Sequence, residues 1–294
     1  MNRRVLSWFL VLILTNFALA DVGYVHLQRD RNDTPVALKT AILRLQSPQG
    51  QIVDLVGVIH VGEKEYYHRL NKHFGNYDSV LYEMVLDVPK NFTHQNYVRD
   101  ILGREKKEPK IDTSKGGRDS LSLFQRKLAE VLELDIQLEH IDYQADNFRH
   151  ADLTLGEFEK AMAKRRPTPL QLLRDFFVSN DANTPTEYKA ISKLPLVKIL
   201  AQGPDAKERE ILRVGVAAYL AQEDDIATDA QGEVLIGMRN KRAIQILKKR
   251  LLKGDKKIAI FYGAAHLPDF TERIKEMGFK TVSKSWLQSW DLTH

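Results

Sequence analysis

Two tetrapeptides of the form Gly-x-x-His lie far apart in the chain, one from Gly57 to His60 and the other from Gly263 to His266. Each closes a short run of apolar and β-branched residues, a pattern typical of a strand that is covered on both faces. In open α/β sheets, ligands bind in the crevice outside the carboxyl ends of the strands. We therefore expect the two histidines to meet at one site.

A third apolar run, residues 78–83, ends in a carboxylate at Glu83. His60, Glu83 and His266 together offer two imidazoles and one carboxylate. This donor set suits a divalent transition ion such as zinc, manganese, cobalt or ferrous iron, with positions left for water or substrate. The glycine of each tetrapeptide would allow close approach of backbone or substrate at a crowded strand end.

Glu83 has two alternative roles at the end of its apolar run. Burying an unpaired carboxylate is costly, so Glu83 should have a cation, a metal or strong hydrogen-bond donors beside it. It could act as a metal ligand or as a general base, and these two roles stay open. The structural alternative is an ion pair, for which Arg239 is a candidate partner.

Arg239 precedes an apolar-periodic segment that predicts a helix beginning near Asn240. If it faces the crevice, its guanidinium could bind a carboxylate or stabilise the oxyanion of a tetrahedral intermediate. The alternative is a surface position on a basic helix. Tyr82 and Tyr262 adjoin proposed site residues, but strand alternation directs them to the opposite face, and we expect both in the core.

His140 and Asp142 are spaced i, i+2 at the end of an expected strand, so they could extend the site or form a supporting carboxylate–imidazole pair. Neither is included in the metal-ligand set. The remaining histidines considered lack a supporting context, and we expect them at the surface: His68, His73, His94, His150 and His294.

The two tetrapeptides, together with Tyr82-Glu83 and Arg239-Asn240, occur in an order that resembles the TraB/PrgY/TIKI superfamily, which includes GumN-type exported proteins. These motifs frame residues 52–270. The resemblance implies an α/β fold similar to erythromycin-esterase-like and haem-binding ChaN-like proteins. For the TIKI branch it also implies a metal-dependent peptidase. One departure is that relatives often carry an Asp-Arg pair after a middle strand, whereas Asp142 is followed here by Tyr143.

Residues 1–20 have the layout of a secretory signal peptide. Arg3 and Arg4 precede an apolar stretch at 5–14, which is much shorter than the roughly 20 residues that span a bilayer as a helix. Small residues follow at positions 18–20. We expect the mature chain to begin near Asp21, to be exported to the periplasm and to contain no transmembrane segment.

The composition excludes several kinds of chemistry. Because the chain has no cysteine, disulfides and thiolate ligands or nucleophiles are ruled out. The 44 Lys and Arg against 39 Asp and Glu become 42 against 39, or +3, once Arg3 and Arg4 are removed. Basic residues concentrate at 239–257 around apolar positions, as in the solvated face of an amphipathic helix, so no nucleic-acid partner is expected.

We expect residues 21–294 to form a single α/β domain with a mostly parallel central sheet and flanking helices. A proline-punctuated helical insertion at approximately 151–235 is expected to cap the carboxyl ends of the strands. The other expected elements are strands at 53–59, 78–83, 136–143 and 257–262, helices at 63–74 and 121–134, and an exposed loop at 103–120.

The sequence has no His-Glu-x-x-His helix, Gly-x-Ser-x-Gly elbow or Gly-rich phosphate loop, so it offers no support for a zincin, a serine hydrolase or a nucleotide-binding protein. We expect an exported metal-dependent hydrolase of peptide or amide bonds, using manganese, cobalt or zinc. His60, Glu83 and His266 would hold the metal, and Arg239 would stabilise the oxyanion. The alternative is a non-enzymatic periplasmic protein that binds haem, metal or peptide at the same crevice.

Overall fold

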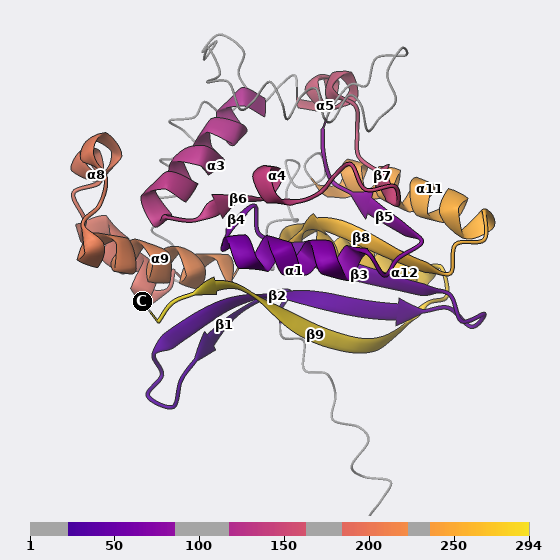
Figure 1. Ribbon diagram of the computed structural model, residues 1–294, viewed down its shortest axis with the longest axis horizontal. Helices are drawn as coiled ribbons and strands as arrows, with labels where there is room; N and C mark the ends of the chain where they lie inside the picture. The colour runs from indigo at the N-terminus through magenta and orange to yellow at the C-terminus, as the bar shows by residue number, and fades with distance from the viewer. Residues whose placement is uncertain (1–22, 86–117, 163–183, 223–235, 294) are drawn as a thin grey trace, which may run out of the picture.

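A mixed β-sheet runs through the molecule, with helices on both faces (Figure 1). The computed structural model describes residues 23–85, 118–162, 184–222 and 236–293. The predicted signal peptide therefore lies outside the described residues.

Four parallel strands form the part of the sheet that positions the site. Their spatial order is β3-β8-β5-β7, and each neighbouring pair is parallel. Their bounds are β3 Ile52–Val58, β8 Lys257–Gly263, β5 Ser79–Tyr82 and β7 Phe148–His150. β3 and β8 are buried after their first residue, as strands covered on both faces must be. The predicted α/β class with a mostly parallel central sheet is confirmed.

Antiparallel strands extend the sheet beyond β3. The long strand β2 pairs through its first half with β1, through its second half with β3, and from Ala37 to Gln46 with β9. The bounds are β1 Val25–Arg29, β2 Pro35–Gln46 and β9 Lys280–Asp291. A separate two-stranded ladder joins β4, Val61–Gly62, to β6, Asp135–Ile136.

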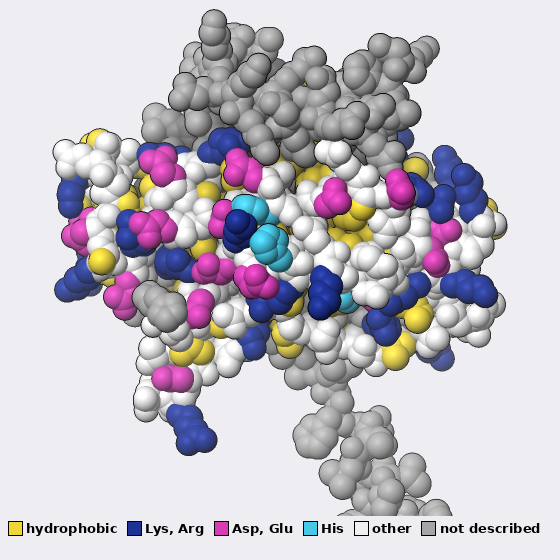
Figure 2. Space-filling model, viewed as in Figure 1, with side chains coloured by type: hydrophobic (Ala, Val, Ile, Leu, Met, Phe, Trp, Pro, Cys, Tyr) yellow, Lys and Arg dark blue, Asp and Glu magenta, His cyan; other side chains and the backbone are white. Residues whose placement is uncertain are grey.

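Helix α1, Lys64–Phe74, covers one face of the parallel strands, while α11, Met238–Leu252, and α12, Leu267–Glu276, cover the other. The buried side of α1 includes Tyr66 and Phe74, which pack with apolar residues of β3, β5 and β8. Charged side chains lie on the outside, where Figure 2 shows both signs interspersed with small apolar areas.

The described helices of the predicted insertion lie beyond the carboxyl ends of the strands. Helix α5 begins shortly after β7, and Arg213 of α9 donates a hydrogen bond to Glu63, which follows β4. The helices are α5 Leu155–Met162, α7 Thr186–Lys189, the 3-10 turn η1 Ala190–Lys193, α8 Leu196–Gln202 and α9 Ala206–Leu220. Pro185 and Pro195 immediately precede α7 and α8. Residues 163–183 and 223–235 of the insertion lie outside the described residues.

None of the helices among the described residues is both long and apolar enough to cross a bilayer. The predicted helix at 121–134 corresponds to α3, Arg118–Leu132. Most of the loop predicted at 103–120 lies outside the described residues, and residues 118–120 belong to α3.

The strand predicted at 136–143 is wrong. Only Ile136 belongs to a strand, and Gln137–His140 form the short helix α4. The backbone N–H of Gln137 donates to the carbonyl oxygen of His60 and extends the β4–β6 ladder by one bond. The chain then turns into α4, where the N–H of Ile141 donates to the carbonyl oxygen of Gln137. A second difference is smaller: α11 begins at Met238, so Arg239 lies in its first turn and not before it.

Candidate functional site

Each of the four parallel strands leads to a side chain of the candidate site at its carboxyl end. His60 follows β3, Glu83 directly follows β5, and Asp152 follows β7. Strand β8 ends at Gly263, and His266 closes the 3-10 turn η4, Ala264–His266, that comes next. The fold thus brings residues from four separated segments to one edge of the sheet.

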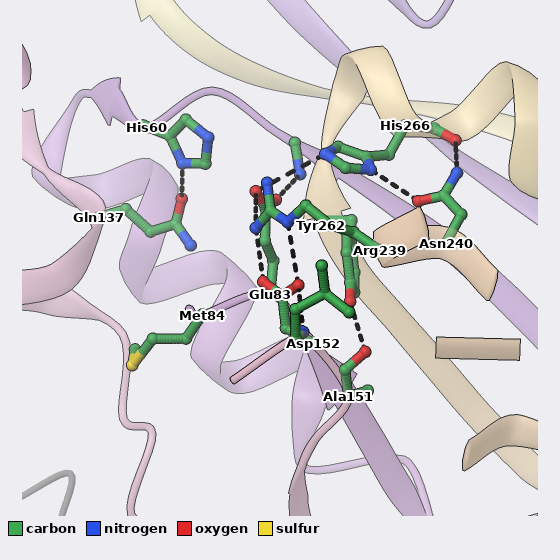
Figure 3. Close-up of polar contacts among 12 residues, drawn as sticks. His60, Glu83, Met84, Gln137, Ala151, Asp152, Arg239, Asn240, Tyr262 and His266 are labelled. Atoms are coloured by element: carbon green, nitrogen blue, oxygen red, sulfur yellow. Dashed lines mark hydrogen bonds and ion pairs between the residues drawn. The ribbon is translucent and has the colours of Figure 1, made fainter. Parts of the chain in front are cut away.

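Gly263 is the point around which the three predicted metal ligands gather. A Cβ atom placed on this glycine would lie 3.4 Å from Oε2 of Glu83, 3.4 Å from Nε2 of His60 and 3.7 Å from Cδ2 of His266. The backbone N–H of Gly263 donates a hydrogen bond of 2.7 Å to Oε2 of Glu83. Figure 3 shows the histidines on two sides of the Glu83–Arg239 pair. The missing side chain leaves the space that the three groups share.

His60 is oriented by an amide from α4. Its Nδ1 lies 2.8 Å from Oε1 of Gln137, while the amide nitrogen of Gln137 donates to the hydroxyl of Tyr143 at 2.6 Å. Because the amide oxygen can only accept, Nδ1 of His60 is the donor. In the neutral imidazole this places the lone pair on Nε2, the nitrogen directed toward Gly263.

His266 is oriented in the same way by an amide from α11. Its Nδ1 lies 2.6 Å from Oδ1 of Asn240. The amide nitrogen of Asn240 donates to the carbonyl of His266 at 3.0 Å and to Asp269 at 2.7 Å, which fixes the amide orientation. Nδ1 of His266 therefore donates, and Nε2 faces Oε1 of Glu83 at 3.7 Å.

Arg239 connects two buried carboxylates. Its Nη2 lies 2.8 Å from Oε1 of Glu83, and its Nε and Nη2 donate to the two oxygens of Asp152 at 2.9 and 2.5 Å. The side chains of Arg239, Glu83 and Asp152 are 11%, 10% and 0% exposed. A cation in the first turn of a helix is disfavoured by the helix dipole, and the two carboxylates offset that cost. The ion pair considered for Glu83 is therefore present.

The surroundings of the site lower the pKa values of both Glu83 and His266. Burial by itself would raise the pKa of Glu83, but the charge of Arg239, the two histidines and the Gly263 hydrogen bond hold this pKa well below its usual range. Burial lowers the pKa of His266 to about 4, against the opposing effect of Glu83. Near neutral pH the site thus combines an ionised carboxylate with a neutral His266.

The donor chemistry fits a divalent transition metal. Imidazole nitrogens directed by second hydrogen bonds from Nδ1 are the usual arrangement of histidine ligands. Each oxygen of Glu83 also keeps unused acceptor capacity beyond the bonds described above. The donor atoms do not converge on one point, however, because no group of three His, Asp or Glu side chains within the described residues has the spacing of a metal site. The predicted metal therefore stays a prediction.

Other candidates from the sequence lie elsewhere. His140 pairs through Nε2 with Asp135 at 2.7 Å, and Asp142 is exposed, so these two do not form the pair considered for them. The difference follows from the turn at Gln137, which replaces the strand that would have put them on one face. Tyr82 and Tyr262 are fully buried, which confirms their predicted place in the core.

Three contributors were missed in the sequence. Gln137 and Asn240 direct the histidines, and Asp152 holds Arg239. Asn240 is part of the Arg239-Asn240 motif, but the sequence indicated no role for it. Gln137 lies in the segment 136–143, which was wrongly predicted to be a strand.

His73 and His150 were expected at the surface, yet both are partly buried, and burial lowers the pKa of each. Nε2 of His150 lies 2.6 Å from the carbonyl of Met84, and Nε2 of His73 lies 2.7 Å from the hydroxyl of Tyr77.

No family model matches this chain, and a comparison with curated proteins gave no match either. The resemblance to the TraB/PrgY/TIKI superfamily therefore remains a prediction from the four motifs.

Proposed function

We propose that the protein is an exported metal-dependent hydrolase whose metal is held by His60, Glu83 and His266. The observation that carries the proposal is that two hydrogen-bond acceptors, Nε2 of His266 and Oε1 of Glu83, face each other. With Nδ1 of His266 bonded to Asn240, Nε2 of the neutral ring turns its lone pair toward Oε1 of Glu83 at 3.7 Å. Oε1 also contacts Arg239 at 2.8 Å, but the contact between Nε2 and Oε1 is one between two acceptors, which repel each other, whereas a bound cation would attract both.

In this proposal Glu83 is a metal ligand and not a general base. A catalytic base works best when its pKa lies near the operating pH. The pKa of Glu83 is held far below its usual range by its surroundings, Arg239 foremost among the charged groups, so its carboxylate is a poor proton acceptor at neutral pH. The same permanent negative charge suits a metal ligand.

The residues around the ligands have positioning roles. Gln137 and Asn240 hold the two imidazoles in one tautomer, and Asp152 anchors Arg239, which keeps Glu83 ionised. A metal bound by this set would act as a Lewis acid and activate water for hydrolysis. Stabilisation of an oxyanion by Arg239 remains part of the proposal, and it would require the guanidinium to contact substrate in addition to its two carboxylates.

The substrate class comes from the family resemblance. A peptide or amide bond is the expected target, and the amino-terminal segment predicts that hydrolysis takes place in the periplasm. Neither choice depends on the site geometry, which would suit other carbonyl substrates as well.

Reconstitution tests the proposal. Protein prepared from periplasm is stripped with chelator, reloaded separately with manganese, cobalt or zinc, and assayed on peptide, amide and ester libraries. We expect turnover that returns with metal, is lost in His266→Ala and persists in His68→Ala, because His68 is exposed and lies outside the site. Equal turnover by the stripped, reloaded and His266→Ala proteins would exclude the mechanism.

One observation favours a second function, the binding of metal or peptide without turnover. Nε and Nη2 of Arg239 already donate to Asp152 and Glu83, so the guanidinium is strongly held in the ground state. Stoichiometric metal binding without hydrolysis in any library would support this alternative. For the haem-binding version, titration with haem should give a Soret band.

A further inference from the structure

A cavity of about 650 Å³ lies beside the edge strand β7, between this strand and the carboxyl-terminal half of α11. This volume is within the range of small-molecule sites. The α11 residues of the cavity lie away from the histidine site, since the ten residue steps from Arg239 to Lys249 correspond to about 15 Å along the helix. On the β7 side, His150 lines the end of the cavity nearest to that site.

The charged groups that line the cavity are cationic. They are Arg149 from β7 and Lys249, Arg250 and Lys253 from α11 and its end, and no carboxylate is among the lining residues. Arg250 is neutralised by an ion pair with Asp255. Within the described part of the chain, the other three form no ion pair, and the guanidinium of Arg149 donates to backbone carbonyls.

The rest of the lining is mainly apolar, apart from the imidazole of His150. Phe148 and Ile246 supply buried and partly buried surface, while Leu252 is 88% exposed at the rim. A leucine this exposed beside unpaired cations offers both an apolar and an electrostatic contact to a ligand. Lys and Arg side chains gather at the right of Figure 2, on the side where α11 lies in Figure 1.

A purely structural reason accounts for only part of this arrangement. Basic residues in the last turn of a helix are stabilised by the helix dipole, which explains Lys249 and Arg250. It does not explain Arg149, which reaches the cavity from a strand, nor the exposure of Leu252.

We propose that this cavity binds a single-chain amphiphilic anion, with the anionic head beside Arg149, Lys249 and Lys253 and the apolar chain against Phe148, Ile246 and Leu252. Charge complementarity selects an anion, and the apolar lining selects a ligand with a hydrocarbon part. This site is independent of the proposed hydrolase activity.

Dodecanoate below its micellar concentration is a suitable probe, and calorimetric titration of the full-length mature protein measures its binding. Acetate has the same head without the chain, and dodecyltrimethylammonium has the same chain with opposite charge. We expect saturable binding of dodecanoate and at least about tenfold weaker binding of both controls, a difference of about 1.4 kcal/mol. Acetate lacks the hydrocarbon chain that would bury apolar surface, and the head of dodecyltrimethylammonium would be repelled by the cationic lining.

Paired variants locate the site. Lys249→Glu combined with Lys253→Glu should weaken dodecanoate binding at least about tenfold, a change of about 1.4 kcal/mol. Lys248→Glu combined with Lys256→Glu makes the same charge change on exposed residues outside the cavity and should alter affinity less than about threefold. Leu252→Ser should weaken binding severalfold without a change in net charge.

Several results would overturn the proposal. These are equal binding of dodecanoate and dodecyltrimethylammonium, equal weakening in the two double variants, or binding to anionic vesicles without binding to monomeric dodecanoate. The last result would identify a membrane surface in place of a soluble amphiphile. All substituted lysines are exposed, so circular dichroism of each variant should match that of the parent.

Discussion

The amide oxygen of Asn240 accepts a hydrogen bond from Nδ1 of His266 at 2.6 Å, and Gln137 makes the equivalent bond to His60 at 2.8 Å. His60 and His266, which follow two different strands, are therefore held in the same tautomer by amides from two different helices. Nε2 of His60 faces Gly263, and Nε2 of His266 faces Oε1 of Glu83. Such outer partners tune metal affinity in known sites.

The first prediction uses Gln137, whose oxygen orients His60. Gln137→Leu removes the acceptor and should weaken metal binding by about tenfold to a hundredfold. Gln137→Glu keeps an acceptor for Nδ1 and can accept from Tyr143, so it should retain the affinity of the parent within about threefold. Titration with cobalt(II), followed by its absorption spectrum, measures both. Equal affinities for the two variants would remove Gln137 from the site.

The second prediction concerns the space at Gly263. Its backbone angles, φ −47° and ψ 138°, are open to alanine, so Gly263→Ala should fold. The added methyl group would lie 3.4 Å from Nε2 of His60 and from Oε2 of Glu83. We expect at least about tenfold weaker metal binding with less than about 1.5 kcal/mol loss of stability.

Gly57→Ala is the matched control for Gly263→Ala. Its methyl group would lie 3.1 Å from Cδ2 of Leu267 and 3.3 Å from the carbonyl oxygen of Ala41, which are packing contacts. Overpacking of this kind should lower the free energy of unfolding by about 1–3 kcal/mol and leave metal affinity unchanged. If Gly57→Ala lost metal as strongly as Gly263→Ala, the effect would be one of folding.

The parallel strands could be predicted from the sequence because strands buried on both faces leave continuous apolar runs. The same runs indicated that His60, Glu83 and His266 lie at strand ends. The strand at 53–59 matches β3, and the one at 257–262 matches β8. β9 escaped prediction because Lys280–Asp291 is largely polar, and its pairing with β2 depends on residues distant in sequence.

The polar residues that support the site could not be predicted in the same way. Gln137 and Asp152 are buried by tertiary contacts with His60 and Arg239, and neither lies in a pattern that marks it. The sequence did supply the ion pair of Glu83 with Arg239 as one alternative. It could not show that Asp152 binds the same guanidinium.

The third prediction separates structural from ligand roles in the ion network. Asp152→Asn would leave the buried Arg239 with one carboxylate, Glu83, and should lower the free energy of unfolding by about 3 kcal/mol. Asp142→Asn changes an exposed carboxylate and should stay within about 0.5 kcal/mol of the parent. Urea unfolding measures both. A loss below about 1 kcal/mol for Asp152→Asn would show that the network contributes little to stability.

The fourth prediction is a pH dependence of the metal-free protein. Burial lowers the pKa of His266 to about 4, whereas in the unfolded chain this histidine takes up a proton near its ordinary value of 6.5. Its contribution to stability is therefore complete above about pH 6.5 and is lost as the pH falls toward about 4. The full effect would be about 3 kcal/mol at most.

Unfolding of the parent and of His266→Gln across this pH range measures the contribution. Burial also lowers the pKa values of the partly buried His73 and His150, so the difference between the two proteins is the quantity to compare. We expect a shallower slope for His266→Gln between pH 4 and 6.5. Parallel curves would mean that His266 is not held neutral by the fold.

The most direct measurement is the amount of metal that the folded protein retains after exposure to manganese, cobalt or zinc and removal of the excess. The parent should hold about one equivalent of one of these ions, while His60→Ala, Glu83→Gln and His266→Ala should each remain folded and hold less than about a tenth. Less than about a tenth of an equivalent in the parent would contradict the account. So would variants that bind metal as the parent does and merely unfold at lower temperature.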